Sequence, residues 1–560
     1  MALTRAAALA SLLAVLTAPR AHAQSATAAS IRTIEQQIQE LQGELAHVRA
    51  DLAKQDAATA AATREAAAAT TASRAAAHAS PAFAYDVPPP APPLIPPGLP
   101  GPFPASSVGA QQASVVGGPE GTVRIGGVTI TLGGFIEGAG IWRSRNEVAD
   151  ISSNWNTGIP LANNPEYYEH ELRFSARQSR LSLLVTGNPN PNTEIQAYFE
   201  TDFQGDSPTA NSNESNSYTP RLRQAYATYA RRDWGFYALA GQAWSLATMF
   251  RTGLIPREEN TPLAIDGQYL PGFTWARQPQ FRVVKEFDHQ RISLGLSLES
   301  PQTVFAPAGP NGVVPASVGT VNYANPGGSG LTPTVDYSTN IAPDIIAKLA
   351  FDPGWGHYEL WGLLRFMQTR VSQPGWGTNK TAIGGGIGVN ALLPLIPRKL
   401  DFQLSFLGGY GIGRYGAAQL PDATIGANGA PVPIPEIQAL VGLVGHPTKR
   451  TDLYAYAGTE QEAARDFTAN GLGYGYGSPL YDNSTCDTEL GAASGCVGDT
   501  SGVWQATLGG WWQFLHGAFG TMELGAQYSY THRQIFPGLG GAPSTNEQIV
   551  MTSFRYLPFQ

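Results

Sequence analysis

Strict alternation of apolar and polar residues near the end of the chain is the feature that most constrains its fold. Between residues 519 and 533, polar side chains occupy nearly every second position. A period of two places the two sets on opposite faces of a β-strand. A strand that is apolar outside and polar inside suits a β-barrel that contacts lipid and encloses water. The polar set is Thr521, Glu523, Gln527, Ser529, Thr531 and Arg533, and the apolar set is Met522, Leu524, Ala526, Tyr528 and Tyr530.

The same alternation recurs throughout residues 121–560, and turn signals divide this region. Short turns alternate with long Gly/Asn/Ser/Pro-rich connections, as periplasmic turns alternate with outer loops in barrels. The pattern predicts an all-β transmembrane barrel of about 16 antiparallel strands with both ends in the periplasm. A barrel of this width is expected to hold an aqueous channel instead of a packed core. The mean hydropathy of -0.15 argues against a bundle of membrane helices, which needs several long apolar runs.

Residues 1–23 predict a secretory signal peptide. A short apolar run at 6–18 follows Arg5 and precedes a small-x-small cleavage pattern at 21–23. The alternative is an uncleaved anchor helix, although the run is shorter than the ~20 residues that span a membrane. Export and a formal net charge of -8 argue against a nucleic-acid partner.

Residues 24–55 predict a short periplasmic α-helical coiled coil, and residues 56–120 predict an Ala/Pro-rich linker. Apolar residues recur alternately every three and four positions from Ile31 to Leu52, which is typical of heptad a and d positions. Isoleucine at both positions favours more than two strands, so we expect a homotrimer. The alternative is a single amphipathic helix that packs on another surface.

The two cysteines, Cys486 and Cys496, lie in one Gly/Ala/Asp/Ser-rich segment. In an oxidising compartment they predict a local disulfide that closes a loop, and two free thiols are the alternative. No Cys/His cluster or HExxH spacing predicts a metal site, and no nucleophile motif predicts catalysis. We therefore expect no cofactor and no enzymatic activity.

Charged residues on the predicted lumen faces form the candidate functional site. The second and fourth predicted strands each carry two arginines, and alternation places Tyr229 on the face of the second pair with Tyr226 opposite. Guanidinium groups in a narrow wet channel attract anions and bind carboxylates bidentately. The alternative is that these charges pair with one another and hold the wall together. The predicted pore-lining residues are Arg173, Arg177, Arg221, Arg223, Arg277, Arg365, Arg533, Glu200 and Asp202.

The long connection at 246–273 is the candidate constriction loop, because a loop of this length can fold into the barrel. It carries Arg251 and Arg257, which are candidate selectivity residues. The alternative is a solvated outer loop that does not contact the lumen.

Several segments resemble the outer-membrane porins of the dicarboxylate-porin (DcaP-like) family, mainly in the first half of the barrel. The resemblance implies a trimeric, sixteen-stranded porin that passes small anionic solutes such as dicarboxylates. It also implies pore roles for Arg180 and Arg282, which alternation places on the face opposite their neighbours. The matching segments are Gly133-Gly-Phe-Ile-Glu, Phe174-Ser-Ala-Arg-Gln-Ser-Arg, Ala197-Tyr-Phe-Glu-Thr-Asp-Phe-Gln-Gly, Arg221-Leu-Arg-Gln-Ala-Tyr, Leu239-Ala-Gly-Gln-Ala-Trp-Ser and Arg277-Gln-Pro-Gln-Phe-Arg.

These observations predict an outer-membrane porin that allows passive diffusion of small hydrophilic, anionic solutes through an arginine-lined channel. Its expected partners are the outer-membrane lipid, two further copies of the chain and the solutes themselves. The alternative is a structural outer-membrane protein of low conductance. Its coiled coil would tether the membrane to the cell wall or to a partner.

Overall fold

The computed structural model describes residues 121–559, except 152–154, 206–218, 289 and 327–335, together with Gln39 and Gly43. The predicted signal peptide, coiled coil and linker lie outside the described residues. The chain divides into two units at residue 101, and the fold described below belongs to the second unit.

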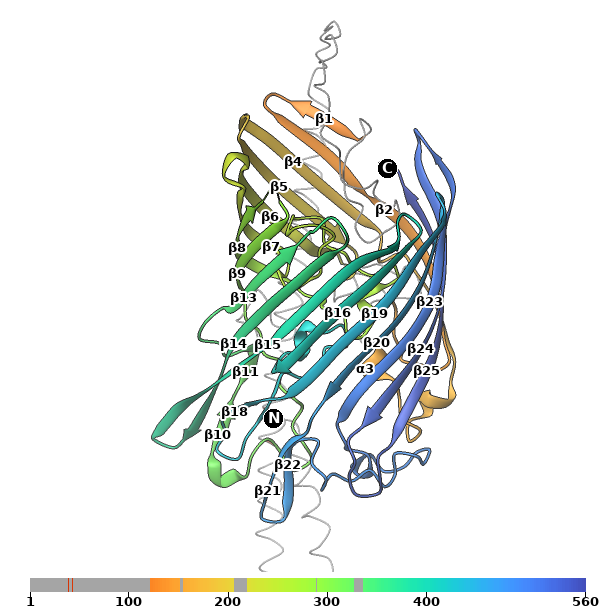
Figure 1. Cartoon of the computed structure of the whole chain (residues 1–560). Coiled ribbons are helices and arrows are strands. Elements are labelled where there is room, and N and C mark those ends of the chain that lie inside the picture. The colour runs from red at the N-terminus through yellow and green to blue at the C-terminus, as the bar shows by residue number, and fades with distance from the viewer. Residues whose placement is uncertain are drawn as a thin grey trace, which may run out of the picture. The chain divides into compact units, whose positions relative to one another are not determined.

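The described strands close into one antiparallel barrel (Figure 1). The main sheet has nineteen strands within the described residues. β1 (Thr122–Ile125) and β10 (Thr320–Asn322) only extend neighbouring strands, and β3 (Glu171–Ser175) with β4 (Arg180–Asn190) forms one wall segment. Sixteen wall segments remain, as the sequence predicts. The others are β2 (Val128–Arg143), β5 (Thr193–Asp202), β6 (Arg221–Arg231), β7 (Phe236–Trp244), β8 (Arg277–Phe287), β9 (Ile292–Glu299), β13 (Asp344–Phe351), β14 (His357–Gln373), β15 (Trp376–Ile396), β16 (Leu400–Tyr410), β19 (Pro435–Thr448), β20 (Thr451–Glu462), β23 (Thr500–Gly517), β24 (Gly520–Ile535) and β25 (Ser544–Leu557).

The barrel closes where β2 pairs with β25, from Ile136↔Tyr556 to Arg143↔Ile549. β25 covers only this part of β2. β1 folds back and pairs with the remaining edge of β2, from Thr122↔Thr131 to Ile125↔Val128. The first strand therefore completes the seam that the last strand leaves open.

Short turns join the strands at one end of the barrel, and long connections join most of them at the other (Figure 1). No helix among the described residues is long and apolar enough to cross a membrane. The connections contain α3 (Trp155–Gly158), η1 (Pro165–Tyr168), η2 (Arg232–Trp234), η3 (Gly267–Tyr269), η4 (Ala316–Val318), β11 (Ala324–Pro326), β12 (Asp336–Ser338), η5 (Gly413–Tyr415), β17 (Ala423–Ile425), β18 (Pro431–Pro433), β21 (Arg465–Ala469), β22 (Leu472–Tyr476) and η6 (Ala493–Gly495).

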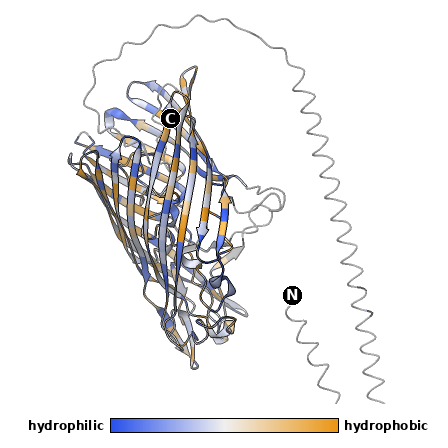
Figure 2. Ribbon diagram, turned by 90° about the vertical axis from the view of Figure 1, so that its right-hand side faces the viewer, coloured by the Kyte–Doolittle hydropathy of each residue, from blue (hydrophilic) through white to orange (hydrophobic). Residues whose placement is uncertain are grey.

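Apolar and polar residues alternate along the wall strands (Figure 2). In β9, Leu294, Leu296 and Leu298 are exposed on the outer surface, whereas Ser293 and Glu299 are fully buried inside. The outer leucines therefore form a surface suited to lipid, as the alternation predicts.

Two irregularities shift the alternation and correct the predicted faces. In the wall segment formed by β3 and β4, the turn at 176–179 interrupts the strand, so Arg180 becomes buried with Ser182. The pairing of β6 with β5 shifts register between Glu200 and Thr201, where β6 has one extra residue. This shift places Tyr226 inside and leaves Tyr229 exposed. The prediction for both tyrosines is therefore wrong, because an extra residue in one strand reverses every following side chain.

Strand β8 also departs from the predicted faces, at Arg282. Its buried polar residues are Gln278, Gln280 and Arg282, whereas Pro279 and Phe281 face outward. Arg282 therefore lies inside, as the family resemblance implies, and the side chain of Arg277, at the first position of β8, lies against Trp244 and the charged residues of the inner wall. The strand begins one residue out of step with the position that alternation assigned to it.

The lumen is occupied by the long connection between β7 and β8, here called the inward loop (residues 245–276). Its residues 259–275 are all buried. Leu263, Ile265 and Phe273 pack with wall residues such as Tyr456 and Trp511 in one apolar cluster. At this level apolar residues of the inner wall pack against the loop, and the aqueous channel stays a prediction.

Candidate solute-binding site in the lumen

An ion-paired group of arginines lies on the inner wall of β4, β5 and β6. Arg223 Nε donates to Glu200 Oε1 at 2.5 Å, and its Nη1 donates to Asp202 Oδ2 at 3.0 Å. Arg221 binds Asp202 with two hydrogen bonds of 3.0 and 2.8 Å. Arg180 Nη1 lies 4.0 Å from Glu200 Oε2. With Arg277, these residues are here called the arginine cluster, and it holds four guanidinium groups and two carboxylates.

Arg277 is the member of the arginine cluster that has no carboxylate ion pair within the described residues. Its guanidinium lies 4.7 Å from the ring centroid of Trp244 and 5.8 Å from that of Trp275. It also interacts electrostatically with Arg221, Arg223 and both carboxylates of the cluster. Its Nη1 is buried and has no hydrogen-bond partner among the described residues, so the aromatic faces hold a guanidinium with an unsatisfied donor.

The cluster is partly accessible to solvent. The Arg221 side chain is 28% exposed, whereas Arg223 and Asp202 are buried. Two further predicted residues lie nearby on the chain. Arg173 is 49% exposed and contacts Glu171 at 2.9 Å, and Arg177 donates to the carbonyls of residues 203 and 205. Arg221 and Arg173 are therefore accessible basic side chains at this wall.

Arg365 and Arg533 do not join the arginine cluster. Arg365 is buried and forms ion pairs with Asp344 and Asp422. Arg414, which sequence reasoning missed, approaches Asp344 at 3.7 Å from a second inward connection, residues 411–434. In the sequence, Arg414 is a lone arginine in a Gly-rich loop. Such a residue does not show whether the loop lies outside the barrel or folds into it.

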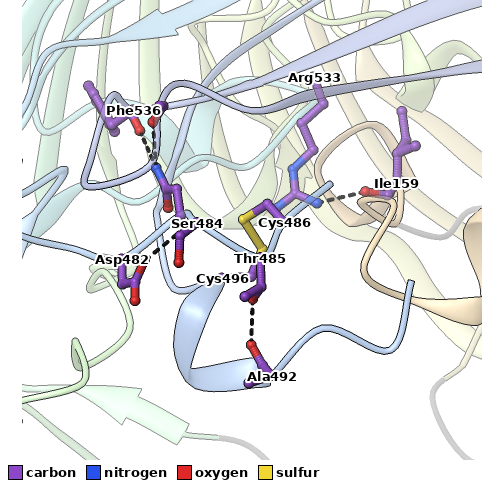
Figure 3. The surroundings of a disulfide bond; sticks show 11 residues. Ile159, Asp482, Ser484, Thr485, Cys486, Ala492, Cys496, Arg533 and Phe536 are labelled. Carbon is purple, nitrogen blue, oxygen red and sulfur yellow. Dashed lines mark hydrogen bonds between the residues drawn. A yellow bond between two sulfur atoms is a disulfide. The ribbon is translucent and has the colours of Figure 1, made fainter. Parts of the chain in front are cut away.

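Arg533 lies near the disulfide at the end of the barrel that carries the long connections (Figure 3). Its Nη1 donates to the carbonyl of Ile159 at 2.7 Å. Cys486 and Cys496 are disulfide-bonded and close a short segment within 463–499. Asn163 N donates to the Cys486 carbonyl at 2.9 Å, so this segment is tied to the first long connection.

Carboxylates on the wall hold the inward loop by its backbone. Glu299 accepts from Leu246 N and Glu359 accepts from Phe250 N, both at 2.8 Å. Glu460 accepts from Gly272 N at 2.7 Å on the far side of the lumen. The loop is thus fixed at both ends of its path, which is a stronger restraint than apolar packing alone.

A chain of ionisable groups reinforces this attachment at β13 and β14. Lys348 is fully buried, and its Nζ lies 2.7 Å from Glu359 Oε2 and 2.7 Å from the Thr248 carbonyl. His357 lies between Glu359 and Asp352 at 3.0 and 2.8 Å. These groups fix residues 247–253 of the loop against the wall.

The two candidate selectivity residues of the inward loop point in different directions. Arg257 Nη2 donates to Gln196 Oε1 on β5 at 2.9 Å. Arg251 is half-buried, and its electrostatic partners include Glu258 and Asp401 on β16. Nearby, burial raises the pKa of Glu259 to about 7. The two arginines therefore do not form a single site.

Within the described part of the chain, no group of three or more acidic, histidine or cysteine side chains is arranged to hold a metal ion. The residues that sequence reasoning missed are mainly apolar. Leu184, Leu239, Trp361, Val444 and Met551 face the lumen and are buried. These residues pack against the inward loop and so set its position. No sequence signal points to this packing, because the residues in contact are far apart along the chain.

No family model matches the chain, and no curated protein matches it. Its fold is similar to the outer membrane channel DcaP of Acinetobacter baumannii, with a TM-score of 0.53 and 15% identity over 77% of this chain and 97% of that chain. It is less similar to the anion-selective porin of Comamonas acidovorans, with a TM-score of 0.38 and 11% identity over 77% and 99% of the two chains. OprB of Pseudomonas putida has a TM-score of 0.40 and 9% identity over 76% and 94%. The fold is therefore that of an outer-membrane porin, and the resemblance to DcaP-like porins is confirmed at that level.

Proposed function

We propose that this protein is an anion-preferring porin that allows passive diffusion of small hydrophilic, dicarboxylate-like solutes. The observation that carries the proposal is the charge imbalance of the arginine cluster, where two carboxylates face four guanidinium groups. The excess charge stays on the accessible Arg221 and on Arg277. A carboxylate solute would bind there bidentately and move on, since no covalent step or cofactor is involved.

The same proposal places the barrel in the outer membrane, with the long connections outside the cell and the N-terminal segment in the periplasm. Loops on the outer side are longer than periplasmic turns in barrels of this class. The heptads at 24–55 would join three copies as a coiled coil, and attachment to the barrel would raise their effective concentration. Its partners are then the lipid and two further copies of the chain, with no nucleic acid.

Planar-bilayer recording tests the proposed selectivity. In a salt gradient, the R221A/R277A double variant should lose anion-over-cation permeability by at least about fivefold, because each of the two removed charges contributes ~1 kcal/mol at 4 Å in water. Arg291→Ala is the matched control, since this exposed arginine lies in a turn beside Asp288 and outside the lumen. A reversal potential that is the same for the wild type and the double variant would exclude the cluster as the selectivity element.

A structural role remains the second candidate function, and the packed inward loop favours it. Residues 259–275 are buried, and several of them pack against apolar residues of the inner wall. A tether protein of low conductance would show no discrete current steps when folded protein is inserted into a bilayer. Steps that scale with chloride or succinate concentration would instead support the porin.

A further inference from the structure

The hairpin of β14 and β15 extends beyond its neighbours at the long-connection end of the barrel (Figure 1). β15 pairs with β14 along Trp376–Leu392. Its other edge pairs with β16 only from Gly385↔Tyr410 onward. The stretch 376–384 therefore has a hydrogen-bonded strand on one side only, among the described strands.

β16 is shorter because its chain leaves the wall. After Tyr410, Gly411 has a positive φ of 67°, and its N–H donates to the carbonyl of Ile434 in the second inward connection. The carbonyl of Gly411 accepts from Arg365 Nη1. The buried Arg365 thus binds the chain that leaves β16 and holds it inside the barrel. Residues 376–384 of β15 are left without a paired strand on this edge, among the described strands.

The opposite edge of the same hairpin shows that an added strand fits. β10 pairs antiparallel with β14 from Thr320↔Ser372 to Asn322↔Arg370. A segment of three residues is enough to form this ladder. On the β15 side, β18 is the nearest other strand, and Pro431 and Pro433 lack the N–H groups needed for a ladder.

Backbone geometry makes the vacant edge a docking surface. In an antiparallel pair, alternate residues direct their N–H and C=O groups away from the partner strand. An exposed edge of this kind is a template for an extended polypeptide. Most residues of 376–383 are exposed or half-buried, and Trp376 and Ile383 are exposed on its flanks.

The charge of the hairpin indicates which polypeptide fits. No acidic residue occurs between Glu359 and Asp401. The projecting part carries Arg370, which is exposed and donates to Asn379, and Lys380, which is half-buried. We propose that the edge at 376–383 binds an acidic, extended segment of another polypeptide by β-strand addition, independently of solute passage.

A second copy of this chain is a poor occupant. Two such edges would bring Lys380 of each copy into one ladder, and like charges directly opposite are destabilising. Lysine on an edge strand is a common device against edge-to-edge pairing. An acidic segment converts the same lysine from a repulsive group into an attractive one.

The test uses the full chain in detergent and a fluorescent ten-residue peptide of alternating glutamate and valine. We expect saturable binding that protects the amides of residues 376–383 from hydrogen exchange. The same peptide with N-methyl groups on alternate backbone nitrogens keeps its charge but loses one ladder edge, so it should bind at least tenfold more weakly. Equal binding of both peptides, or binding without protection of 376–383, would overturn the proposal.

Variants separate the edge from general charge attraction. R370E/K380E should abolish binding of the glutamate peptide, while R291E, which reverses an exposed turn arginine, should not. Single-channel conductance of each variant reports whether the barrel is folded. If R291E weakens binding as much as R370E/K380E, the attraction is unspecific and the edge is not the site.

Discussion

The two sides of the lumen use opposite charges for different purposes. On β4–β8, arginines pair with wall carboxylates and retain a positive excess, and Arg221 stays partly accessible. On β9, β14 and β20, carboxylates accept backbone N–H groups of the inward loop and are buried. The acidic side therefore holds the loop, and the solute contacts that we propose fall on the basic side.

Removal of the inward loop should have the largest effect. Ser245 N already donates to the Ala276 carbonyl at 2.9 Å, so a short Gly/Ser turn can replace residues 247–274 without opening the wall. Sixteen strands then enclose a wide aqueous channel. We expect unit conductance to rise several-fold and anion preference to fall in bilayer recordings.

The matched control for this deletion removes residues 466–475 of the β21–β22 hairpin, a separate two-stranded sheet outside the barrel wall. Its conductance should match that of the wild type. If both deletions raise conductance equally, or if neither does, the inward loop is not the element that fills the lumen.

The next largest effect is expected at the buried ion pair of the acidic side. Lys348→Met removes one of the two cationic partners of Glu359, the other being His357, together with two hydrogen bonds to loop carbonyls. Breaking a buried pair by removal of one partner costs about 3–5 kcal/mol. Urea unfolding in micelles should show this loss, with faster hydrogen exchange at residues 246–253.

Lys285→Met provides the comparison for the buried pair, because Lys285 is exposed on the outer face of β8. Surface substitutions of this kind change stability by about 0.5 kcal/mol or less. Similar losses for the two methionine variants would show that the Lys348 pair adds no specific stability.

Opening the disulfide should affect the long-connection end and leave the lumen unchanged. The C486S/C496S variant lacks a bond that closes a ten-residue separation, and a short closed loop contributes about 2–4 kcal/mol. We expect faster exchange of amides in 480–499 with unchanged conductance. A change in ion selectivity would instead mean that this segment narrows the passage.

The smallest effect concerns the pH dependence of the inward loop. Burial raises the pKa of Glu259 from 4.5 to about 7. A raised carboxyl pKa favours the folded loop while the group is protonated, so this stability is complete below about pH 4.5 and is lost as pH rises through 7. Hydrogen exchange of residues 250–260 should therefore speed up between pH 5 and 8.

Glu259→Gln removes the titrating group and keeps a similar shape, so exchange in this variant should no longer depend on pH beyond the intrinsic rate. A pH response that persists in the variant would assign the effect to another group on the acidic side. Glu460 is the first alternative, because it accepts the Gly272 N–H of the inward loop and the Ala418 N–H of the second inward connection.

The barrel is predictable from local sequence pattern alone. Alternation with a period of two depends only on neighbouring residues, so the sixteen wall segments and the outer leucines of β9 follow from local pattern. It failed for Tyr226, Tyr229 and Arg282, because a bulge or a strand start moves the faces by one residue. Such shifts arise from pairing between strands, which a single strand does not encode.

The position of the inward loop, in contrast, depends on contacts between residues far apart in the sequence. Leu263 N bonds to Tyr456, and Ile265 N bonds to Gln527, across separations of 193 and 262 residues. The arginine cluster likewise became a site with excess charge once its ion pairs were fixed by register between β4, β5 and β6. Local pattern identifies which residues face inward. Their partners are set by the pairing of strands when the barrel closes, and that pairing joins residues far apart in the sequence.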